Sequence, residues 1–360
     1  MSRAVQDDLF ALIIAGGRGT RFWPWSRRAR PKQCLSVDGG PTLIQQTLAR
    51  ITPLIPVERV LVVTSAEMAG PLAEQLPDLP PENLLVEPVG RNTAPAIGWG
   101  ASEIARRAKG RNPVVAVLPS DHLITHEARF RAALLACAEA ASQTNALVTV
   151  GIEPDRPETG FGYLEIGAEV GQWHGHPMRR VRRFVEKPDA ETAARYVAGG
   201  QHLWNAGMFV FTAEAIRDAF RQHLPHTWAA LERLRHSPER LNEIYPTLER
   251  TSIDYGIMER APYVLTAPVD LGWSDLGSWA ALAEHVPASP LGRARVDAAI
   301  AIGANDNLVI APGKLVAMVG VHGLAVVDTG DALLICPLEQ AQRVREVIDA
   351  MEREGLEDYL

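Results

Sequence analysis

The stretch from Leu9 to Val37 constrains this chain more than any other part of its sequence. It opens with an apolar run of strand length, Leu9–Ala15, and then breaks into glycines at positions 16, 17 and 19. Six cations lie in and after this loop, with no acidic residue among them: Arg18, Arg21, Arg27, Arg28, Arg30 and Lys32. A buried strand that ends in a glycine loop lets backbone N–H groups approach a ligand, and flanking cations make the loop an anion site. We therefore predict a polyphosphate site here, with a solvated basic turn as the alternative.

Two familiar phosphate-binding loops are excluded by spacing. A dinucleotide-binding fingerprint that begins at Gly17 would need a glycine at position 22, where the sequence has Phe22. A P-loop would need Gly-Lys-Ser/Thr five residues after its first glycine, but Gly16 leads to Arg21 and Gly17 leads to Phe22. The loop therefore belongs to another class of phosphate site.

The composition limits the kind of protein that carries this site. The chain has 360 residues and a formal net charge of −7, which predicts two domains, or one with an appendage, and excludes a nucleic-acid-binding surface. Its three cysteines are far apart and form no Cys-x-x-Cys pair, so neither a disulfide framework nor a zinc site is indicated. The early apolar run is too short to span a bilayer and follows two aspartates, which predicts a cytoplasmic protein without a signal peptide or membrane segment.

Apolar runs of strand length recur along the first half of the chain, with helical segments between them. After Leu9–Ala15 they lie at residues 59–65, 83–88, 113–122 and 146–152. This is the spacing of βαβ units, which predicts a mostly parallel sheet with right-handed crossovers. Beyond them the alternation is less regular, with strands expected at 161–166, 179–188 and 204–211, helices at 191–199 and from about 212 to 260, and a strand, a loop and a helix start within 263–279.

The C-terminal part of the chain has a different pattern. Residues 287–298 are rich in Pro, Gly and Ala, and we place a domain boundary there, giving domains at 1–286 and 287–360. Short apolar runs separated by turn residues follow between Asn307 and Pro337, which predicts an all-β unit. A last amphipathic helix is marked by apolar residues at helical spacing, Val344, Val347, Ile348 and Met351.

Two aspartates are candidate metal ligands. Asp121, in the motif LPSDH, lies just past a predicted buried strand, as the glycine loop does. Ligands of open α/β sheets lie beyond the carboxyl ends of the strands, so Asp121 and the loop should face one crevice. An acidic residue beside bound phosphates indicates a cation between them, and Asp275, in GWSDLGSW, could supply a second carboxylate for the same magnesium ion. The alternatives are a helix N-cap for Asp121 and an ordinary turn for Asp275.

Further polar positions could contact a sugar or a base. Glu186 and Lys187 are adjacent at a strand end, where a carboxylate suits sugar hydroxyls and a lysine suits a phosphate; the alternative is a surface charge pair. Asn205 enters a strand with a carboxamide that can both donate and accept. Gly160 lies in RPETGFGY, which suits close packing against a sugar face, although an ordinary turn explains it better. The polar pair at 92–93 could read a purine edge or cap a helix.

Taken together, these stretches resemble the mannose-1-phosphate guanylyltransferases, a branch of the sugar-nucleotide pyrophosphorylases, over nearly the whole chain. The resemblance rests on nine motifs in order: AGGRGTRFWP, RPKQ, RNTAPAI, LPSDH, RPETGFGY, FVEKPD, LWNAGMF, SIDYGIMER and GWSDLGSW. It implies an α/β fold: a Rossmann-like nucleotidyltransferase domain with a mixed, mostly parallel sheet, followed by a small left-handed β-helix-like domain. We expect the isomerase domain that is fused to some relatives to be absent. Trp25 and Cys34 depart from the residues more usual in the family, which affects packing beside the loop more than chemistry.

The resemblance also implies the substrates and the site. They are GTP and mannose 1-phosphate, converted to GDP-mannose and pyrophosphate with Mg²⁺ by a homodimer. The nucleotide would be bound by Ala15, Gly16, Gly17, Gly19, Thr20, Arg21, Lys32, Arg91, Asn92, Thr93 and Asp121. The sugar phosphate would be bound by Gly160, Tyr163, Glu186, Lys187, Asn205 and Gly207. Catalysis would rest on Arg21, Lys32, Asp121 and Asp275, the two aspartates holding the metal.

The expected mechanism needs no protein nucleophile, because the attacking phosphate is already ionised. An oxygen of mannose 1-phosphate attacks the α-phosphorus of GTP in line, and catalysis is positioning plus neutralisation of charge. Two alternatives stay open within this fold. One is a pyrophosphorylase for another base or sugar, such as glucose with UTP or dTTP. The other is a non-catalytic, nucleotide-sugar-sensing subunit, which should have lost Lys32, Asp121 or Asp275; all three are present.

Overall fold

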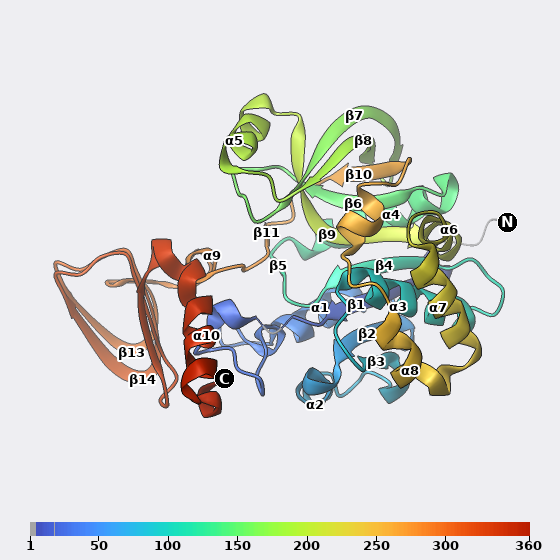
Figure 1. The fold of residues 1–360 in the computed structure, drawn as a ribbon. Coiled ribbons are helices and arrows are strands. Elements are labelled where there is room, and N and C mark those ends of the chain that lie inside the picture. The colour runs from blue at the N-terminus through green and yellow to red at the C-terminus, as the bar shows by residue number, and fades with distance from the viewer. Residues whose placement is uncertain (1–4, 18) are drawn as a thin grey trace.

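The computed structural model describes residues 5–17 and 19–360 (Figure 1). Arg18, one of the six cations of the predicted loop, lies outside the described residues. Within them, the centre of the molecule is a nine-stranded mixed sheet in the order β3-β2-β1-β4-β9-β6-β10-β8-β7. Its strands are β1 (Leu9–Ala15), β2 (Val60–Ser65), β3 (Leu84–Glu87), β4 (Val114–Pro119), β6 (Leu147–Ile152), β7 (Gly162–Trp173), β8 (His176–Glu186), β9 (His202–Thr212) and β10 (Val264–Pro268).

The two halves of this sheet are paired differently. Strands β3, β2, β1 and β4 are parallel, as their βαβ spacing predicts. Strand β9 runs antiparallel to both β4 and β6, and β7 and β8 form an antiparallel pair, while β10 returns parallel to β6. The prediction of a mixed sheet is confirmed, with its parallel pairing concentrated in the half that ends at the glycine loop.

Helices cover both faces of the sheet, which is why β1 is apolar at every position. Alternate residues of a strand point to opposite faces, so Leu9 and Ile13 pack with helix α4, and Phe10 and Leu12 pack with α3 and α6. The helices are α1 (Leu43–Ile51), α2 (Ala66–Gln75), α3 (Thr93–Arg107), α4 (Glu127–Thr144), α5 (Ala190–Gly199), α6 (Ala213–His223), α7 (Pro225–His236), α8 (Leu241–Ile244), α9 (Trp279–Ala283) and α10 (Val344–Glu354). None of the described helices is long and apolar enough to cross a membrane.

The C-terminal unit is a separate sheet, drawn in orange and red in Figure 1. In the described chain it has five strands, of which β13, β14 and β15 are parallel neighbours. The strands are β12 (Ala288–Ser289), β13 (Gly292–Ile302), β14 (Asn307–Val319), β15 (Leu324–Asp328) and β16 (Leu333–Pro337). Two details correct the sequence analysis. The stretch 287–298 contains β12 and much of β13 instead of a linker, and the Pro-Gly-Lys segment at 312–314 lies inside β14 instead of separating two strands.

This C-terminal unit packs directly on the loop that follows β1. The indole of Trp279, fully buried, contacts Phe22 and Trp25, and the same cluster includes apolar residues of β14, β15 and α10. Hydrogen bonds add to this packing, since Trp23 Nε1 donates to the Tyr359 carbonyl at 2.7 Å and Arg27 Nη1 donates to it at 2.6 Å. The predicted appendage is therefore part of the structure that shapes the loop.

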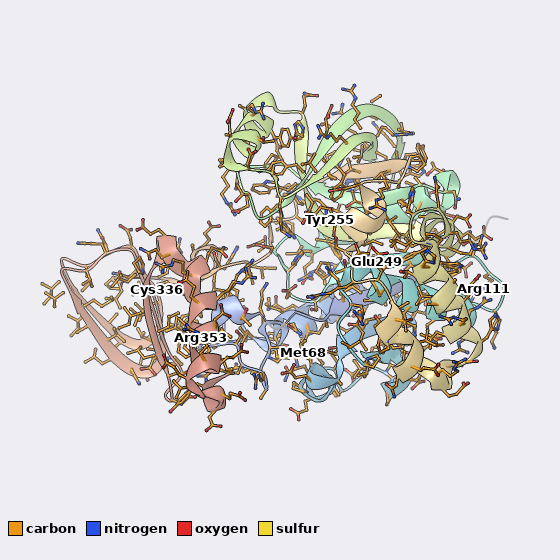
Figure 2. All side chains as sticks on the ribbon, in the orientation of Figure 1. Met68, Arg111, Glu249, Tyr255, Cys336 and Arg353 are labelled. Atoms are coloured by element: carbon orange, nitrogen blue, oxygen red, sulfur yellow. The ribbon has the colours of Figure 1, made fainter. Side chains whose placement is uncertain are left out.

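All three cysteines are free thiols in the part of the chain that the structure describes. Cys34 and Cys137 are buried in the core of the large sheet, and Cys336 lies in the C-terminal unit (Figure 2).

Candidate active site

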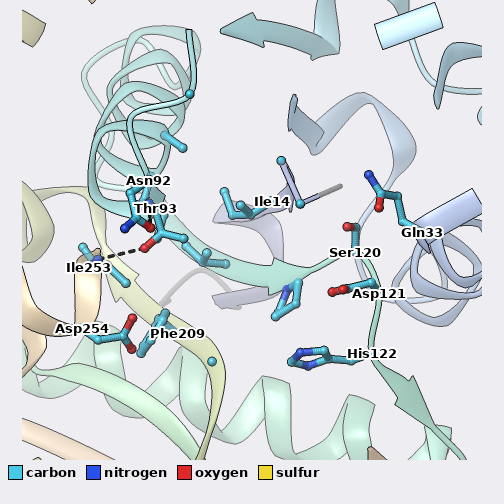
Figure 3. Close-up of a pocket in the computed structure, with 18 of the residues that line it drawn as sticks. Ile14, Gln33, Asn92, Thr93, Ser120, Asp121, His122, Phe209, Ile253 and Asp254 are labelled. Atoms are coloured by element: carbon cyan, nitrogen blue, oxygen red, sulfur yellow. Dashed lines mark hydrogen bonds between the residues drawn. The ribbon is translucent and has the colours of Figure 1, made fainter. Parts of the chain in front are cut away.

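A cavity of about 430 Å³ opens at the carboxyl ends of β1, β3 and β4 (Figure 3). It is lined by the glycine loop at Gly16 and Gly17, by Glu87 at the end of β3, and by Ser120 and Asp121 just after β4. This is the edge at which open α/β sheets bind their ligands. The structure therefore brings the predicted polyphosphate loop and the first predicted metal ligand to one cavity.

The loop needs glycine at position 19 because of its contact with Lys32. Gly19 has φ of +64°, and a Cβ atom built there would lie 2.2 Å from the Cβ atom of Lys32. A side chain at position 19 would therefore displace Lys32, in addition to straining the backbone. The hydroxyl of Ser26 donates to the Gly19 carbonyl at 2.7 Å, which holds the turn closed.

Lys32 joins the two predicted metal ligands. Its ammonium group donates to Asp121 Oδ2 at 2.8 Å and to the backbone carbonyl of Asp275 at 2.6 Å, and the residue is only 7% exposed. Burial disfavours the charged form of Asp121, yet the Lys32 ammonium beside it holds the pKa of that carboxyl below its usual range. The pKa of Asp275 is raised, chiefly by burial and further by the negative charge of Asp121.

A short ladder that sequence analysis did not predict places the two aspartates together. Strands β5 (Leu123–Ile124) and β11 (Trp273–Ser274) pair antiparallel, with Ser274 opposite Leu123. Asp275 follows directly on β11 and Asp121 precedes β5 by two residues. The ladder thus aligns one segment after β4 with another that lies far along the chain.

Acidic and amide groups gather at another part of the cavity. Asn205 Nδ2 donates to Asp254 Oδ1 at 3.1 Å, and Asp254 lines the cavity opposite Asp121 in the view of Figure 3. Glu186 ends strand β8 beside them and is paired with Lys187, whose ammonium lies 2.9 Å from Glu186 Oε1. The site thus has a cationic part around Lys32 and a predominantly acidic part around Asp254.

Comparisons with known proteins agree with this geometry. The chain matches the nucleotidyl transferase family over residues 10–289 and the MannoseP isomerase/GMP-like beta-helix domain over residues 297–351. The chain belongs to the nucleotidyl transferase family. The family match to 297–351 also confirms the predicted β-helix-like C-terminal unit.

Individual relatives of this nucleotidyl transferase span nearly its whole length. It is 38% identical over 358 residues to the xanthan biosynthesis protein XanB of Xanthomonas campestris pv. campestris, covering 97% of this chain and 74% of that protein. It is 37% identical over 363 residues to the mannose-1-phosphate guanylyltransferase ManC of Salmonella typhimurium, covering 98% and 75%. The crystal structure of mannose-1-phosphate geranyltransferase from Thermus thermophilus is similar with a TM-score of 0.86 and 36% identity, over 96% of this chain and 99% of that one.

The carboxylates of this nucleotidyl transferase suit a divalent cation that the protein and a bound substrate would hold together. Among the described residues no group of three or more His, Cys, Asp or Glu side chains could hold a metal ion alone. Asp121 and Asp275 interact electrostatically, and both are half-buried carboxylates beside a single positive charge, that of Lys32. Magnesium usually takes one or two carboxylates plus phosphate oxygens and water, which matches two aspartates beside a phosphate loop.

Some predicted site residues do not face the cavity. The side chain of Tyr163 is fully buried and its hydroxyl donates to the Glu158 carbonyl, so this residue does not line the cavity. The guanidinium of Arg91 donates to the Pro246 carbonyl, and Arg91 is not part of the cavity wall. Thr20 faces α10 of the C-terminal unit.

Four other predicted nucleotide- or sugar-binding residues lie at or beside the cavity. Asn92, with φ of +69°, caps helix α3, and its Oδ1 accepts from the backbone N–H of Thr93 at 2.8 Å. Thr93 Oγ1 accepts from the backbone N–H of Ile253 at 2.9 Å, the dashed line in Figure 3. The helix cap is therefore realised, and both capping residues still line the cavity. Ala15 is buried at the end of β1, and Gly207 lines the cavity.

Arg21 and Gly160 line an adjoining pocket of about 340 Å³, into which Asp275 also opens. Arg21 Nη1 lies 3.4 Å from the Gly277 carbonyl, and the backbone N–H of Gly160 donates to Glu158 Oε1 at 3.0 Å. Lys32, hydrogen-bonded to Asp121 of the cavity and to the carbonyl of Asp275, therefore connects the cavity with this pocket.

Sequence reasoning missed two carboxylates of this nucleotidyl transferase. Glu87 is 6% exposed and accepts a hydrogen bond from the hydroxyl of Tyr245; burial raises its pKa. The available signal was its place at the end of a strand beside the glycine loop. Asp254 lies in SIDYGIMER, a motif with no local feature that separates a buried carboxylate from a helix cap.

Proposed function

We propose that the chain transfers GMP from GTP to α-D-mannose 1-phosphate and releases pyrophosphate, giving GDP-mannose. The observation that carries this proposal is the buried Lys32 ammonium, held between Asp121 and Asp275 at the mouth of the glycine loop. Relatives that carry the name mannose-1-phosphate guanylyltransferase align with nearly the whole chain, which supports the choice of substrates.

The chain's own residues act by position and charge. Backbone N–H groups at Gly16 and Gly17 face the cavity without side chains in the way, so triphosphate oxygens can approach them. Lys32 presents a compact charge to the α-phosphate, where negative charge changes as the bond to pyrophosphate breaks. Arg21, in the adjoining pocket, is placed to neutralise the departing pyrophosphate. The mannose 1-phosphate oxygen is itself the nucleophile, so the protein only has to align it.

We further propose that the divalent cation is Mg²⁺ and that Asp121 and Asp275 hold it. When bound, such an ion neutralises phosphate charge and polarises the α-phosphoryl group. The rise in the pKa of Asp275, caused by burial and by the charge of Asp121, supports a site that binds a cation more tightly than two isolated carboxylates would.

A carboxylate in the cavity favours guanine over the other bases. The Watson–Crick edge of guanine presents two adjacent donors, its N1–H and its exocyclic amine. Glu87 offers two acceptor oxygens, one of which receives the Tyr245 hydroxyl. Uracil, thymine, adenine and cytosine each place a carbonyl or ring-nitrogen acceptor next to their donor, which would face the negative carboxylate. We therefore assign Glu87, with Asn92 and Thr93, to the base.

The sugar phosphate is assigned to the acidic part of the site. Glu186 suits hydroxyls, and Lys187, 58% exposed at the tip of β8, suits the phosphate of mannose 1-phosphate. Asn205, Gly160 and Gly207 complete this part.

The boundary of the two domains between residues 286 and 287 stays a proposal, as does a cytoplasmic location, which the free thiols favour.

The test is a grid of four nucleoside triphosphates against several sugar 1-phosphates, scored by pyrophosphate release. GTP with mannose 1-phosphate is expected to have the highest kcat/KM of all pairs. The same grid on Glu87→Gln should lose preference for GTP over the other triphosphates, because an amide donates as well as accepts. A tenfold preference of the wild type for UTP or dTTP contradicts the guanylyl assignment. If no pair of substrates gives pyrophosphate release, the result points to a regulatory subunit.

We also propose a homodimer that uses an exposed apolar face of the C-terminal unit. In the register of β13 and β14, Ile302 lies beside Val319, and Ala298 lies beside Leu315. Residues two apart in a strand share a face, so Ile300 belongs to the same surface. These large side chains are 48–65% exposed, and isolated proteins rarely leave a continuous apolar face in water.

Charge on this face should therefore separate the subunits. Light scattering at micromolar concentration is expected to give a dimer for the wild type and a monomer for Leu315→Glu combined with Val319→Glu. Val170→Glu, an exposed apolar residue on β7, is the matched control and should stay dimeric. A monomeric wild type, or a dimer that survives both glutamates, contradicts the proposal. Point variants are preferable to truncation, because the C-terminal unit packs on the glycine loop.

A further inference from the structure

Asp254 stands out among the cavity residues that the proposed mechanism does not use. It begins a π-helical turn, Asp254–Met258, before strand β10. Such turns are rare and occur frequently at functional sites. In Figure 3 its carboxylate projects into the cavity from the side opposite Asp121.

Its neighbour Asn205 is held in one orientation. The backbone N–H of Gly207, which can only donate, points to Asn205 Oδ1 at 3.3 Å, and the buried hydroxyl of Thr149 donates to the same oxygen at 2.9 Å. The amide nitrogen of Asn205 must therefore face the other way, toward Asp254 Oδ1, at 3.1 Å. Asn205 is 9% exposed, and these contacts fix the carboxylate plane of Asp254.

The second carboxylate oxygen of Asp254 is left without a hydrogen-bond donor. No other residue in the described chain donates to Oδ2, and Asp254 lies half-buried beside Asn205, Glu186 and Lys187. Burial, with the charge of Glu186 as a second cause, raises the pKa of Asp254 to about 7. Because Asp254 lines the cavity, this oxygen can accept a hydrogen bond from a bound ligand, and a hydrogen bond to a charged group contributes more affinity than one between neutral groups.

The charge around Asp254 defines what that ligand group can be. Asp254 and Glu186 are both acidic, so a phosphate would be repelled directly beside Asp254, whereas the exposed Lys187 that follows β8 can still meet the phosphate of mannose 1-phosphate. A neutral hydroxyl donates readily to a carboxylate and adds no charge. The groups that suit phosphates lie elsewhere: the glycine loop lines a different part of the cavity, and Lys32 is hydrogen-bonded to Asp121 in that part.

We propose that Asp254 is a further substrate-binding residue, whose free oxygen accepts a hydrogen bond from a hydroxyl of the hexose. Asn205 is then a positioning residue that aims this oxygen instead of a direct ligand of the sugar. The proposal rests on the proposed function for the identity of the hexose. The ribose hydroxyls of the nucleotide could donate the same hydrogen bond. A contact with the hexose and a contact with the ribose predict different kinetics.

The test uses steady-state kinetics with each substrate varied in turn. Asp254→Asn should raise KM for mannose 1-phosphate about 10- to 100-fold, the range for a hydrogen bond to a charged group, while KM for GTP changes less than about threefold. Asp218→Asn, a 57% exposed aspartate on α6, is the matched control and should behave as the wild type. Asn205→Ala should raise KM for mannose 1-phosphate by a smaller factor.

Deoxy analogues of mannose 1-phosphate identify the hydroxyl. The wild type should lose most of its kcat/KM with one analogue, and Asp254→Asn should show little further loss with that same analogue. If Asp254→Asn does not fold, Asp254→Glu keeps the charge but moves it by one methylene, and the same selective rise in KM is expected.

Four outcomes separate the alternatives. A rise in KM for GTP alone would place the hydroxyl on the ribose and overturn the hexose assignment. Unchanged KM values for both substrates, in a wild type that makes GDP-mannose, would refute the role of Asp254 and leave the proposed function intact. A wild type inactive with GTP and mannose 1-phosphate would refute the proposed function itself, and equal loss with all deoxy analogues would refute a specific contact.

Discussion

Lys32→Ala is expected to lower turnover about 10²- to 10³-fold, the loss typical of removing one electrostatic group that stabilises a transition state. The ammonium is buried beside the cavity and already oriented by Asp121 and the Asp275 carbonyl, so it needs no rearrangement as charge develops on the α-phosphate. The fold should survive, because the cavity lets water reach the Asp121 carboxylate that loses its partner. A pyrophosphate-release assay measures the turnover, and a far-UV circular dichroism spectrum checks that the fold is intact.

The matched control is Lys109→Ala, which removes an exposed lysine from the turn after α3 and should leave turnover unchanged. Near-normal turnover of Lys32→Ala would show that this lysine only balances the charge of Asp121. A loss shared by Lys109→Ala would point to a general charge effect on substrate capture.

The second large effect is expected from Asp121→Asn and Asp275→Asn, each of which should cut turnover severely and weaken its dependence on magnesium. If both carboxylates hold one ion, their effects are not additive, and the double variant should be little worse than the poorer single one. Lys32 contacts the side chain of Asp121 but only the backbone of Asp275. Asp275→Asn therefore removes a carboxylate while both hydrogen bonds of Lys32 remain.

The decisive measurement is a magnesium titration of activity in the wild type, both single variants and the double variant. Losses that multiply fully, with unchanged magnesium dependence, would mean that the two aspartates act separately and share no ion.

In the absence of divalent ions, the substitutions Asp121→Asn and Asp275→Asn should change the unfolding temperature Tm in opposite directions. The pKa of Asp121 is lowered against the opposing effect of burial, chiefly by Lys32, so its charge stabilises the fold at neutral pH, and Asp121→Asn should lower Tm. The pKa of Asp275 is raised by burial and by Asp121, so its charge opposes folding at neutral pH, and Asp275→Asn should raise Tm. The difference for Asp275 should fade below about pH 4, where this carboxyl is protonated in either state, whereas the difference for Asp121 should fade only as pH falls further, through its lowered pKa in the folded state.

Local features of the sequence were enough to determine much of this protein. The run Leu9–Ala15 is apolar at every position because both faces of β1 are covered, and the glycines after it can only form an open turn at that edge. Strands β2, β3, β4 and β6 begin and end within a few residues of their apolar runs. Helix α1 is preceded by its N-cap residue Thr42, whose N–H donates to Gln45 Oε1 at 2.9 Å, the capping pair that Thr and Gln at this spacing form. Each of these depends on neighbours within one turn or one strand.

Tertiary structure alone decided which of the candidate residues act together. Lys32 meets Asp121 and Asp275 across 89 and 243 residues, through the β5–β11 ladder, whose strands are too short to leave a pattern in the sequence. For Tyr163 and Asp254 the sequence pattern did not reveal where the side chain points. Tyr163 lies in a glycine-rich motif but is buried in the core, and Asp254 lies in a helical stretch but faces the cavity. The direction of a side chain depends on close packing with distant elements, and periodicity along the chain carries no information about those partners.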